Sequence, residues 1–564
     1  MAAAALVNGA YRGGYAADRI MFPTKALNET AENFDKWVSL AKQEEQLDLD
    51  DVVCALQQGH AAQRSAALQL LGAAAHEQPS LSPQLLPWLL PHLEDESLAV
   101  KQAALHALGK LGEQAAGSAQ ELLEFLRDES PELRAAAAEA LGDLGTCEFL
   151  EDLRPCISDP DPTVAKAALV AAQKWGENSQ QLASTILTCF KSNERGVRCE
   201  AVKALASFAE ASERLAGEVA EVLQDGDNLA REAAVNYFAA AGPRSARRAA
   251  ATAASFLRGP SAAAAALALG HMRATSYAEQ VAGLLSAAEP PDRSLAHSAA
   301  GLERRLAVEL RRPECGAARA LMLMGPAGAV YADSVAALLM DTKRPAESLA
   351  SIIRSVAGMG SEADRHKGKI QSFMDHPTAS VREATCAAMG LLAEAGAVGG
   401  EAILSRLGDS QACVRCAAAR ACRQLKEPSL YVDTVAKLIE DPVPAVQAEA
   451  LRSIAAMGEE GHAYAATMCR LAVAAEKQPV NAMVRAAALE SLGALGAPGA
   501  EFAEEVAACF EADERDVRRA ALVAMSCFGE EGKAFLTEVE RLRSDPCEPV
   551  RAAADSCAMS LANA

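Results

Sequence analysis

The chain has 564 residues, and its 75 acidic and 54 basic residues give a formal net charge of −21. This balance argues against a nucleic-acid-binding protein, because such proteins neutralise phosphates with Lys and Arg; it suits basic partners or simple solubility. Apolar residues make up 51% of the chain but aromatic residues only 4%, which favours helices packed closely through small side chains over a single large core.

Residues 1–50 differ from the rest of the chain and are expected to form an N-terminal extension. Glycines argue against a helix in its first half, where Tyr11, Tyr15 and Phe22 are typical of a docking peptide. Residues 30–43 show an amphipathic helical pattern, as expected of a helix that caps the first unit of a repeat protein. Whether the extension binds a partner or only caps the repeats stays open.

From residue 51 to residue 564 the chain repeats one pattern. A small apolar residue, usually followed by Arg, recurs at intervals of 31 to 38 residues in two series. The positions are Val100, Leu133, Val164, Val197 and Ala230, and then Val381, Val414, Val446, Val484, Val517 and Val550. With weaker copies elsewhere, about sixteen units are expected, and a fixed period of this length is typical of a solenoid.

Each unit is expected to be a pair of antiparallel helices, as residues 427–461 illustrate. Apolar residues at helical spacing run through 432–439, stop at an Asp-Pro pair, and resume through 446–457 before a glycine. The aspartate is a helix cap, the proline suits a first helical turn, and the glycine ends a helix. The pattern therefore predicts a helix, a tight turn and a second helix.

An aspartate precedes a basic residue by six positions in five of the units. The pairs are Asp95 and Lys101, Asp128 and Arg134, Asp225 and Arg231, Asp409 and Arg415, and Asp545 and Arg551. The aspartate of the turn and the cation of the following helix are expected to meet, within one unit or across to the next, in a ladder along one edge. The other interpretation is a cap beside a solvent-exposed cation, a pair that contributes little to stability.

The pattern D-x-x-x-x-V-R-x-A-A-x-x-A-L-x-x-L-G, spread over residues 60–564, resembles HEAT repeats. More specifically, it is similar to the short HEAT-like units of the phycobilisome-lyase and armadillo-type superfamily. The resemblance implies an all-α fold, a right-handed α-solenoid superhelix of helical hairpins, in which the Asp and Arg residues form an inter-repeat ladder. The family includes scaffolds, transport receptors, bilin lyases and a hydroxylase, so the resemblance alone implies no single function.

Residues 243–330 depart from the pattern and are expected to form irregular units. Between Pro243 and Pro313 the chain has ten arginines, no lysine and five acidic residues. This interval is predicted to accept an acidic segment of a protein partner; the plainer alternative is a solvent-exposed face. The candidate partner-binding residues are Arg244, Arg247, Arg248, Arg304, Arg305, Arg311 and Arg312, with Tyr11, Tyr15 and Phe22 of the extension.

The sequence contains no recognisable catalytic or cofactor motif: P-loop, dinucleotide-binding, zincin and nucleophile-elbow patterns are all missing. Deoxyhypusine hydroxylase resembles the chain in its repeats and binds two irons through repeated His-Glu dipeptides, whereas this chain has only His76-Glu77. The cysteines of residues 412–422 are expected to be core residues, and not a redox pair or a zinc site. We therefore expect no cofactor, no metal and no catalytic residue.

Fifteen cysteines, an odd number spread along the whole chain, indicate a reducing compartment. No apolar run reaches the ~20 residues that span a bilayer, and no basic region precedes the apolar residues at the N-terminus. An intracellular, cytoplasmic location is expected. A plastid or another organelle is the alternative if a transit peptide has been removed.

These observations predict a non-enzymatic scaffold or adaptor that binds other proteins along a curved repeat surface, within a larger assembly. The partners would be proteins, not nucleic acid. Two alternatives stay open, a transport receptor of the HEAT class and a bilin lyase-like protein that handles a chromophore. The length of the chain, enough for two lyase subunits, and the lack of a His or Cys cluster for a tetrapyrrole argue against the lyase.

Overall fold

The computed structural model describes residues 49–77, 82–286, 302–341, 343–393, 400–425, 428–473, 480–545 and 547–563. Within these ranges the chain forms α-helices and short 3-10 helices and no strand, so the all-α prediction is confirmed. The docking tail and capping helix predicted for residues 1–50 lie outside the described residues, except for the start of α3 (Leu49–Gln58). No helix in the described part is long and apolar enough to span a membrane.

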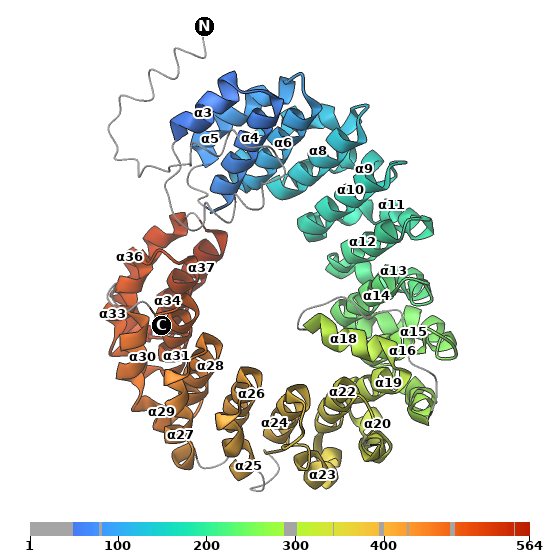
Figure 1. Ribbon diagram of the computed structural model, residues 1–564, viewed down its shortest axis with the longest axis vertical. Coiled ribbons are helices and arrows are strands. Elements are labelled where there is room, and N and C mark those ends of the chain that lie inside the picture. Colours follow the sequence, from blue (N-terminus) through green and yellow to red (C-terminus); the bar gives the residue numbers. More distant parts are fainter. Residues whose placement is uncertain are drawn as a thin grey trace. The chain divides into compact units, whose positions relative to one another are not determined.

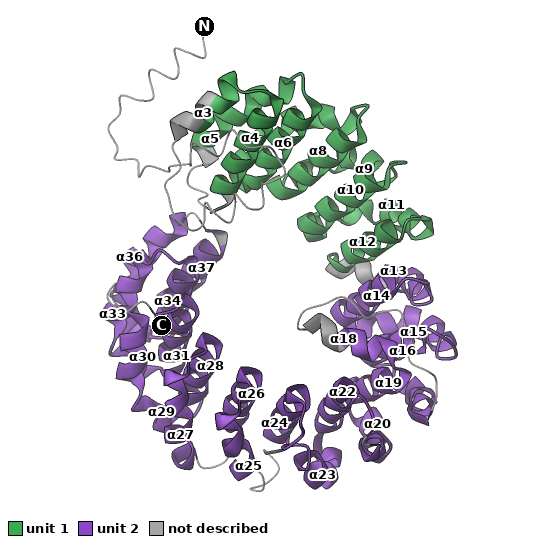
Figure 2. Cartoon of the chain, viewed as in Figure 1, with its two compact units in different colours: residues 1–208 green, residues 209–564 purple. Residues whose placement is uncertain are grey.

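The chain divides into two compact units, residues 1–208 and residues 209–564 (Figure 2). Within each unit, helical hairpins follow one another, and the second helix of one hairpin packs against the second helix of the next (Figure 1). The second helices of the first unit are α4 (Ala61–Glu77), α6 (Leu98–Lys110), α8 (Pro131–Leu144), α10 (Pro162–Trp175) and α12 (Arg195–Ala206). Those of the second unit are α14 (Asn228–Ala241), α16 (Ala262–His271), α19 (Pro313–Leu323), α22 (Ala346–Ala357), α24 (Ala379–Ala393), α26 (Ala412–Cys422), α28 (Pro444–Ala455), α31 (Ala482–Leu495), α34 (Arg515–Met525) and α37 (Glu548–Asn563).

The first helices of the hairpins are mostly shorter, and many of them continue into a 3-10 helix. In the first unit they are α3, α5 (Ser82–Leu89), α7 (Ala119–Leu122), α9 (Leu150–Ile157) and α11 (Ala183–Thr188). In the second unit they are α13 (Ala209–Val222), α15 (Ala246–Ser255), α17 (Ala278–Ala282), α21 (Ala332–Ala337), α23 (Lys367–Gln371), α25 (Gly400–Ser405), α27 (Val432–Ala436), α30 (Ala465–Ala472), α33 (Ala503–Ala508) and α36 (Leu536–Arg541). Four short helices connect hairpins: α20 (Pro326–Ala329), α29 (Glu459–His462), α32 (Ala497–Ala500) and α35 (Gly529–Lys533).

Capping residues explain where the second helices begin. Helix α8 follows Ser130, whose hydroxyl accepts a hydrogen bond from the main-chain N–H of Leu133, and it has Pro131 in its first turn. Helix α10 follows Asp161, whose carboxylate accepts a hydrogen bond from the N–H of Thr163. These side chains satisfy N–H groups that have no partner inside the helix. The hairpins thus have the order of helix, turn and helix that the repeat pattern predicts.

Small residues let the second helices approach one another closely. The buried residues of α8 are mostly alanine. A Cβ atom placed on Gly142 in α8 would lie 2.6 Å from the Cα atom of Ala171 in α10. Larger side chains would not fit between backbones at this separation. The packing therefore accounts for the high alanine and low aromatic content of the chain.

An additional helix, α18 (Leu302–Arg311), interrupts the repeats within residues 243–330. It contacts the second helices α14, α16, α19 and α22 of the same unit, and Figure 1 shows it beside α16. Every residue of α16 from Ala262 to Gly270 is buried. A helix that is covered on all sides needs no polar face, which explains why the sequence of α16 lacks the charged positions of the repeat pattern.

Candidate protein-interaction surface

The turn between the two helices of a hairpin contains an aspartate that organises the start of the second helix. Asp409 precedes α26, and its Oδ1 atom accepts a hydrogen bond from the main-chain N–H of Gln411 at 2.9 Å. Asp95 and Asp441 make the same contact with the N–H two residues further on, each at 2.8 to 2.9 Å. Each carboxylate thereby caps its own turn and keeps the remaining lone pairs for another partner.

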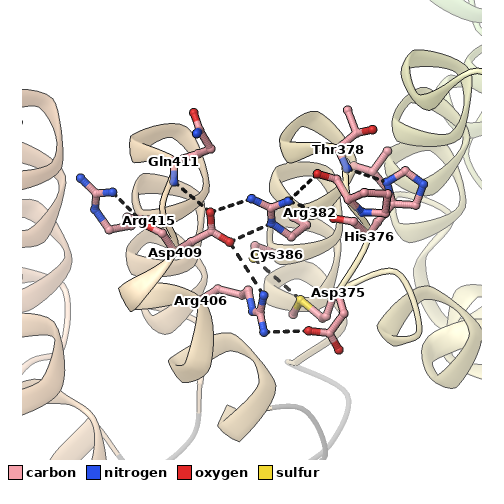
Figure 3. A network of polar contacts seen from close by, with 12 residues as sticks. Asp375, His376, Thr378, Arg382, Cys386, Arg406, Asp409, Gln411 and Arg415 are labelled. Carbon is pink, nitrogen blue, oxygen red and sulfur yellow. Dashed lines mark hydrogen bonds and ion pairs between the residues drawn. The ribbon is translucent and has the colours of Figure 1, made fainter.

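That other partner is an arginine of the preceding hairpin. The Nε and Nη2 atoms of Arg382 in α24 both lie 2.8 Å from the carboxylate of Asp409 (Figure 3). The Nη1 atom of Arg382 donates to the main-chain oxygens of His376 and Pro377 at 2.9 and 3.0 Å. One guanidinium therefore ties the turn before its own helix to the turn of the next hairpin.

The same contact recurs along both units. The pairs are Arg64 with Asp95, Arg134 with Asp159, Arg382 with Asp409, Arg415 with Asp441, and Arg518 with Asp545, at closest N···O distances of 2.7 to 2.8 Å. We call these five pairs the Arg–Asp ladder. Each pair is bidentate and at most about a quarter of either side chain is exposed, which makes it stronger than an ordinary surface ion pair.

The structure places the ladder pairs across hairpins. Arg134 and Arg415, two of the predicted residues, donate to the main-chain oxygens of Asp128 and Asp409 at 2.9 and 2.8 Å. Their charged pairs are instead with the aspartates of the following hairpin. The spacing of six residues thus reflects a contact of the arginine with the backbone of its own turn.

Of the other three predicted cations, Lys101 and Arg231 make different contacts, and Arg551 keeps the contact with the backbone of its own turn. Lys101 pairs with no carboxylate of the described residues, and its ammonium lies 6.0 Å from the centroid of the Phe125 ring. Lysine lacks the planar fork that matches a carboxylate. Arg231 donates to the main-chain oxygen of Pro260 at 3.2 Å, because the next turn has no aspartate. Arg551 donates to the main-chain oxygen of the aspartate six residues before it, at 3.0 Å.

The arginines favour the ionised form of three ladder carboxylates, those of Asp95, Asp409 and Asp441. A hydrogen bond from Arg382 lowers the pKa of Asp409 and outweighs the opposing effect of burial. Arg64 lowers the pKa of Asp95 in the same way. At Asp441 burial is the largest single effect and acts to raise the pKa, but the hydrogen bonds from Arg415 and from a main-chain N–H together lower it.

The predicted arginines of residues 243–313 whose side chains the structure describes differ in exposure. Arg244, Arg247 and Arg248 are exposed at and before the start of the first helix α15. Arg248 also donates to the main-chain oxygen of Arg214 in α13, at 3.4 Å. These three side chains form an exposed basic cluster, which we call the α15 cluster.

Arg311 and Arg312, at the end of α18, are half-buried. Arg312 lies 3.6 Å from the carboxylate of Glu314, which also pairs with Arg344 at 3.0 Å. A structural ion-pair group of this kind differs from a basic surface open to a partner. The remaining candidates have side chains outside the described residues: Arg304, Arg305, Tyr11, Tyr15 and Phe22.

The cysteines of α26 are free thiols. Cys413 is exposed and Cys416 half-buried, and Cys422 is buried, which raises its pKa to about 12. A thiol with so high a pKa is unreactive and packs as a small apolar group. In the ranges that the structure describes, no three His, Cys, Asp or Glu side chains are arranged to hold a metal ion.

Two segments of the first unit match sequence profiles of known repeats. Residues 61–111 match the profile described as a HEAT-like repeat, and residues 119–188 match the profile described as HEAT repeats. A comparison with curated proteins gave no match.

The fold is similar to that of importin-beta proteins. The Kap95:Nup1 complex aligns with a TM-score of 0.58, at 14% identity, over 95% of this chain and 80% of that one. Yeast importin-beta (Kap95p) gives a TM-score of 0.55 at 14% identity, over 91% and 78% of the two chains. Importin beta crystallised in ammonium sulfate gives 0.53 at 14% identity, over 96% and 81%. At this identity the likeness shows a shared fold only; the two matched segments are HEAT-type repeats, and the chain has the α-solenoid fold of HEAT-repeat proteins.

Proposed function

We propose that the chain is a non-enzymatic scaffold or adaptor that binds other proteins along the stacked second helices of its HEAT repeats. The observation that supports this most is the stacking itself, in which each second helix packs on the next within a unit and adds one row of side chains to a continuous surface. Exposed apolar side chains on this layer, such as Leu391 in α24 and Val523 in α34, offer contacts to a protein partner.

A transport receptor is the second candidate, because the similar solved structures include importin-beta, and one of them is a complex of Kap95 with Nup1. At 14% identity this likeness supports the fold, so the scaffold role is the broader conclusion. A bilin lyase-like activity is the enzymatic alternative. It would need a site for a tetrapyrrole, and the described residues supply no cluster of His and Cys for one.

We further propose that the α15 cluster is one contact for an acidic partner. Its three arginines are exposed, and the chain as a whole is strongly acidic, so the cluster would attract anions at one place. Arginine suits carboxylates, which it can bind through two N–H groups at once.

Both the scaffold function and the role of the α15 cluster are tested by affinity purification from the native cell. The experiment uses the wild type and a variant with Arg244, Arg247 and Arg248 all replaced by Glu. We expect the wild type to bring down a protein partner in a fixed ratio without visible absorbance. The reversed variant should associate more slowly and show a flatter dependence on salt, with unchanged helical content. A co-purifying chromophore without a partner would favour the lyase, and unchanged association would show that the α15 cluster is only a solvent-exposed face.

A further inference from the structure

A second set of ion pairs joins the second helices of the second unit, away from the ladder turns. Five arginines take part: Arg354 of α22, Arg420 of α26, Arg423 directly after α26, Arg452 of α28 and Arg519 of α34. We call them the arginine row. In the described part of the chain their ion pairs are with three glutamates, one each on α24, α28 and α31. The set therefore has an excess of two positive charges.

The glutamate of α28 holds two of the arginines. The Nε and Nη2 atoms of Arg420 lie 3.1 and 2.8 Å from the two carboxylate oxygens of Glu449. Arg423 pairs with the same carboxylate, and its Nε donates to the hydroxyl of Ser453 at 3.2 Å. Burial acts to raise the pKa of Glu449, but the nearby arginines outweigh it and lower the pKa, so the glutamate stays charged beneath them.

The pattern continues over the neighbouring helices. The Nε atom of Arg452 lies 3.0 Å from an oxygen of Glu490 in α31, whose other oxygen lies 3.5 Å from Arg519. At the other end, Arg354 lies 3.3 Å from Glu383. From α22 to α34, consecutive second helices other than α24 and α26 are thus linked by arginines that bridge to the carboxylate of a neighbour.

Four of the five arginines are more exposed than the carboxylates that hold them, and the exception is Arg354, at 20% against 25% for Glu383. The side chain of Arg420 is 65% exposed, whereas that of Glu449 is 9% exposed. Arg452 and Arg519 are each 39% exposed, against 29% for Glu490. A guanidinium has five N–H groups, and the pair with Glu449 uses two of those on Arg420. The glutamates therefore fix the arginines in place and leave donors for a ligand.

The two sides of these hairpins also differ in charge. The four helices α26, α28, α31 and α34 contain seven arginines and three acidic residues. The helices that precede and connect them carry exposed glutamates, among them Glu459, Glu460, Glu504 and Glu505. Positive charge is therefore concentrated on the second helices of a chain whose net charge is −21.

We propose that the arginine row binds an extended, carboxylate-rich segment of a protein partner. This inference rests on the proposed function and names the chemistry of one partner. Packed helices lie about 8–10 Å apart, and a segment in the extended polyproline II conformation advances about 3.1 Å per residue with three residues per turn, so every third side chain lies on one face. Acidic side chains at every third residue of the segment would therefore meet successive second helices, and arginine binds a carboxylate through two parallel hydrogen bonds.

Fluorescence anisotropy with the full-length protein tests the proposal. The probe is a labelled peptide with Asp at every third position and Gly or Ser between; the comparison peptide has the same composition with its Asp residues together at one end. Replacing Arg420, Arg452 and Arg519 by Gln should raise the Kd of the spaced peptide about tenfold, a change of about 1.4 kcal/mol. The clustered peptide should bind the wild type more weakly than the spaced one.

A matched triple variant separates the arginine row from total charge. Arg127→Gln, Arg365→Gln and Arg541→Gln remove the same charge from exposed arginines that also pair with a carboxylate of another hairpin, and we expect this variant to bind like the wild type. Should the row triple lose helical content, Arg420→Gln alone suffices, because Glu449 keeps its pair with Arg423, and it should weaken binding about threefold.

The proposal would be overturned if the two triple variants lost binding of the spaced peptide equally, or if the wild type did not prefer the spaced peptide to the clustered one. Tighter binding of a labelled single-stranded RNA than of the spaced peptide would also overturn it. The last test is whether the row triple still binds the native partner. If the row triple still retains that partner in full, the arginine row is not its site, while the scaffold function itself stands.

Discussion

Replacing Arg415 by alanine is expected to lower the local stability of the hairpins around α26 and α28 by about 3 kcal/mol. The change removes two bonds to Asp441, at 2.7 and 2.8 Å, and one to the main-chain oxygen of Asp409. It also leaves Asp441, whose side chain is only 5% exposed, as a charge without its cation. Loss of one partner of a buried ion pair typically costs about 3–5 kcal/mol. Hydrogen exchange measured by mass spectrometry on peptides of these helices reports this local opening.

A double-mutant cycle with Asp441→Ala shows whether the two residues act as a pair. The double variant should be less destabilised than the sum of the single variants by at least about 1 kcal/mol. The exposed pair of Arg127 and Asp152, with side chains 77% and 34% exposed, is the matched control, and its coupling should stay below about 0.5 kcal/mol. Strictly additive effects at Arg415 and Asp441 would mean that the ladder does not couple neighbouring hairpins.

Replacing Gly142 by alanine is expected to destabilise the packing of α8 on α10 by about 1–3 kcal/mol, the usual cost of an overfilled core. The new Cβ atom would lie 2.6 Å from the Cα atom of Ala171 and 2.8 Å from its Cβ atom. Because the first of these is a backbone atom, the two helices must move apart. Thermal unfolding followed by circular dichroism, with hydrogen exchange to localise the change, measures the effect.

Gly368→Ala is the control for that substitution. Gly368 lies in α23, and a Cβ atom there would meet nothing within 4 Å. Alanine at an exposed helical glycine should stabilise by about 0.5–1 kcal/mol. If Gly142→Ala were as harmless as Gly368→Ala, the second helices would not be packed as closely as described.

The sequence predicts the helical hairpins because their signals are local. The turn aspartate, the proline in the first turn and the apolar spacing all lie within one unit, and the structure has helix, turn and helix at the expected places, as in residues 432–457. The local sequence does not determine which aspartate each arginine of the Arg–Asp ladder pairs with. Arg134 has an aspartate six residues before it and another 25 residues after it, and only packing decides that the later one, Asp159, receives the charged pair.

The spacing rule also misses ladder members. Arg382 and Arg518 lack an aspartate six residues earlier and instead bind the main-chain oxygens of His376 and Ala512. Any residue supplies that oxygen, so the useful signal is an arginine directly after the recurring apolar residue, followed by an aspartate in the next turn. The helix α18 has no repeat signal at all, and its position over α16 follows from packing in three dimensions.

The central claim is that partners bind along the second helices. Site-specific photocrosslinking to the native partner is the most direct test of it. A photoreactive residue would replace Leu391 in α24 or Val523 in α34, which are 59% and 40% exposed. The controls are Met340 and Leu430, 69% and 63% exposed, in 3-10 helices next to the first helices α21 and α27. We expect crosslinked partner from one or both of the first two positions and none from the controls. Crosslinks at Met340 and Leu430 alone would contradict the account.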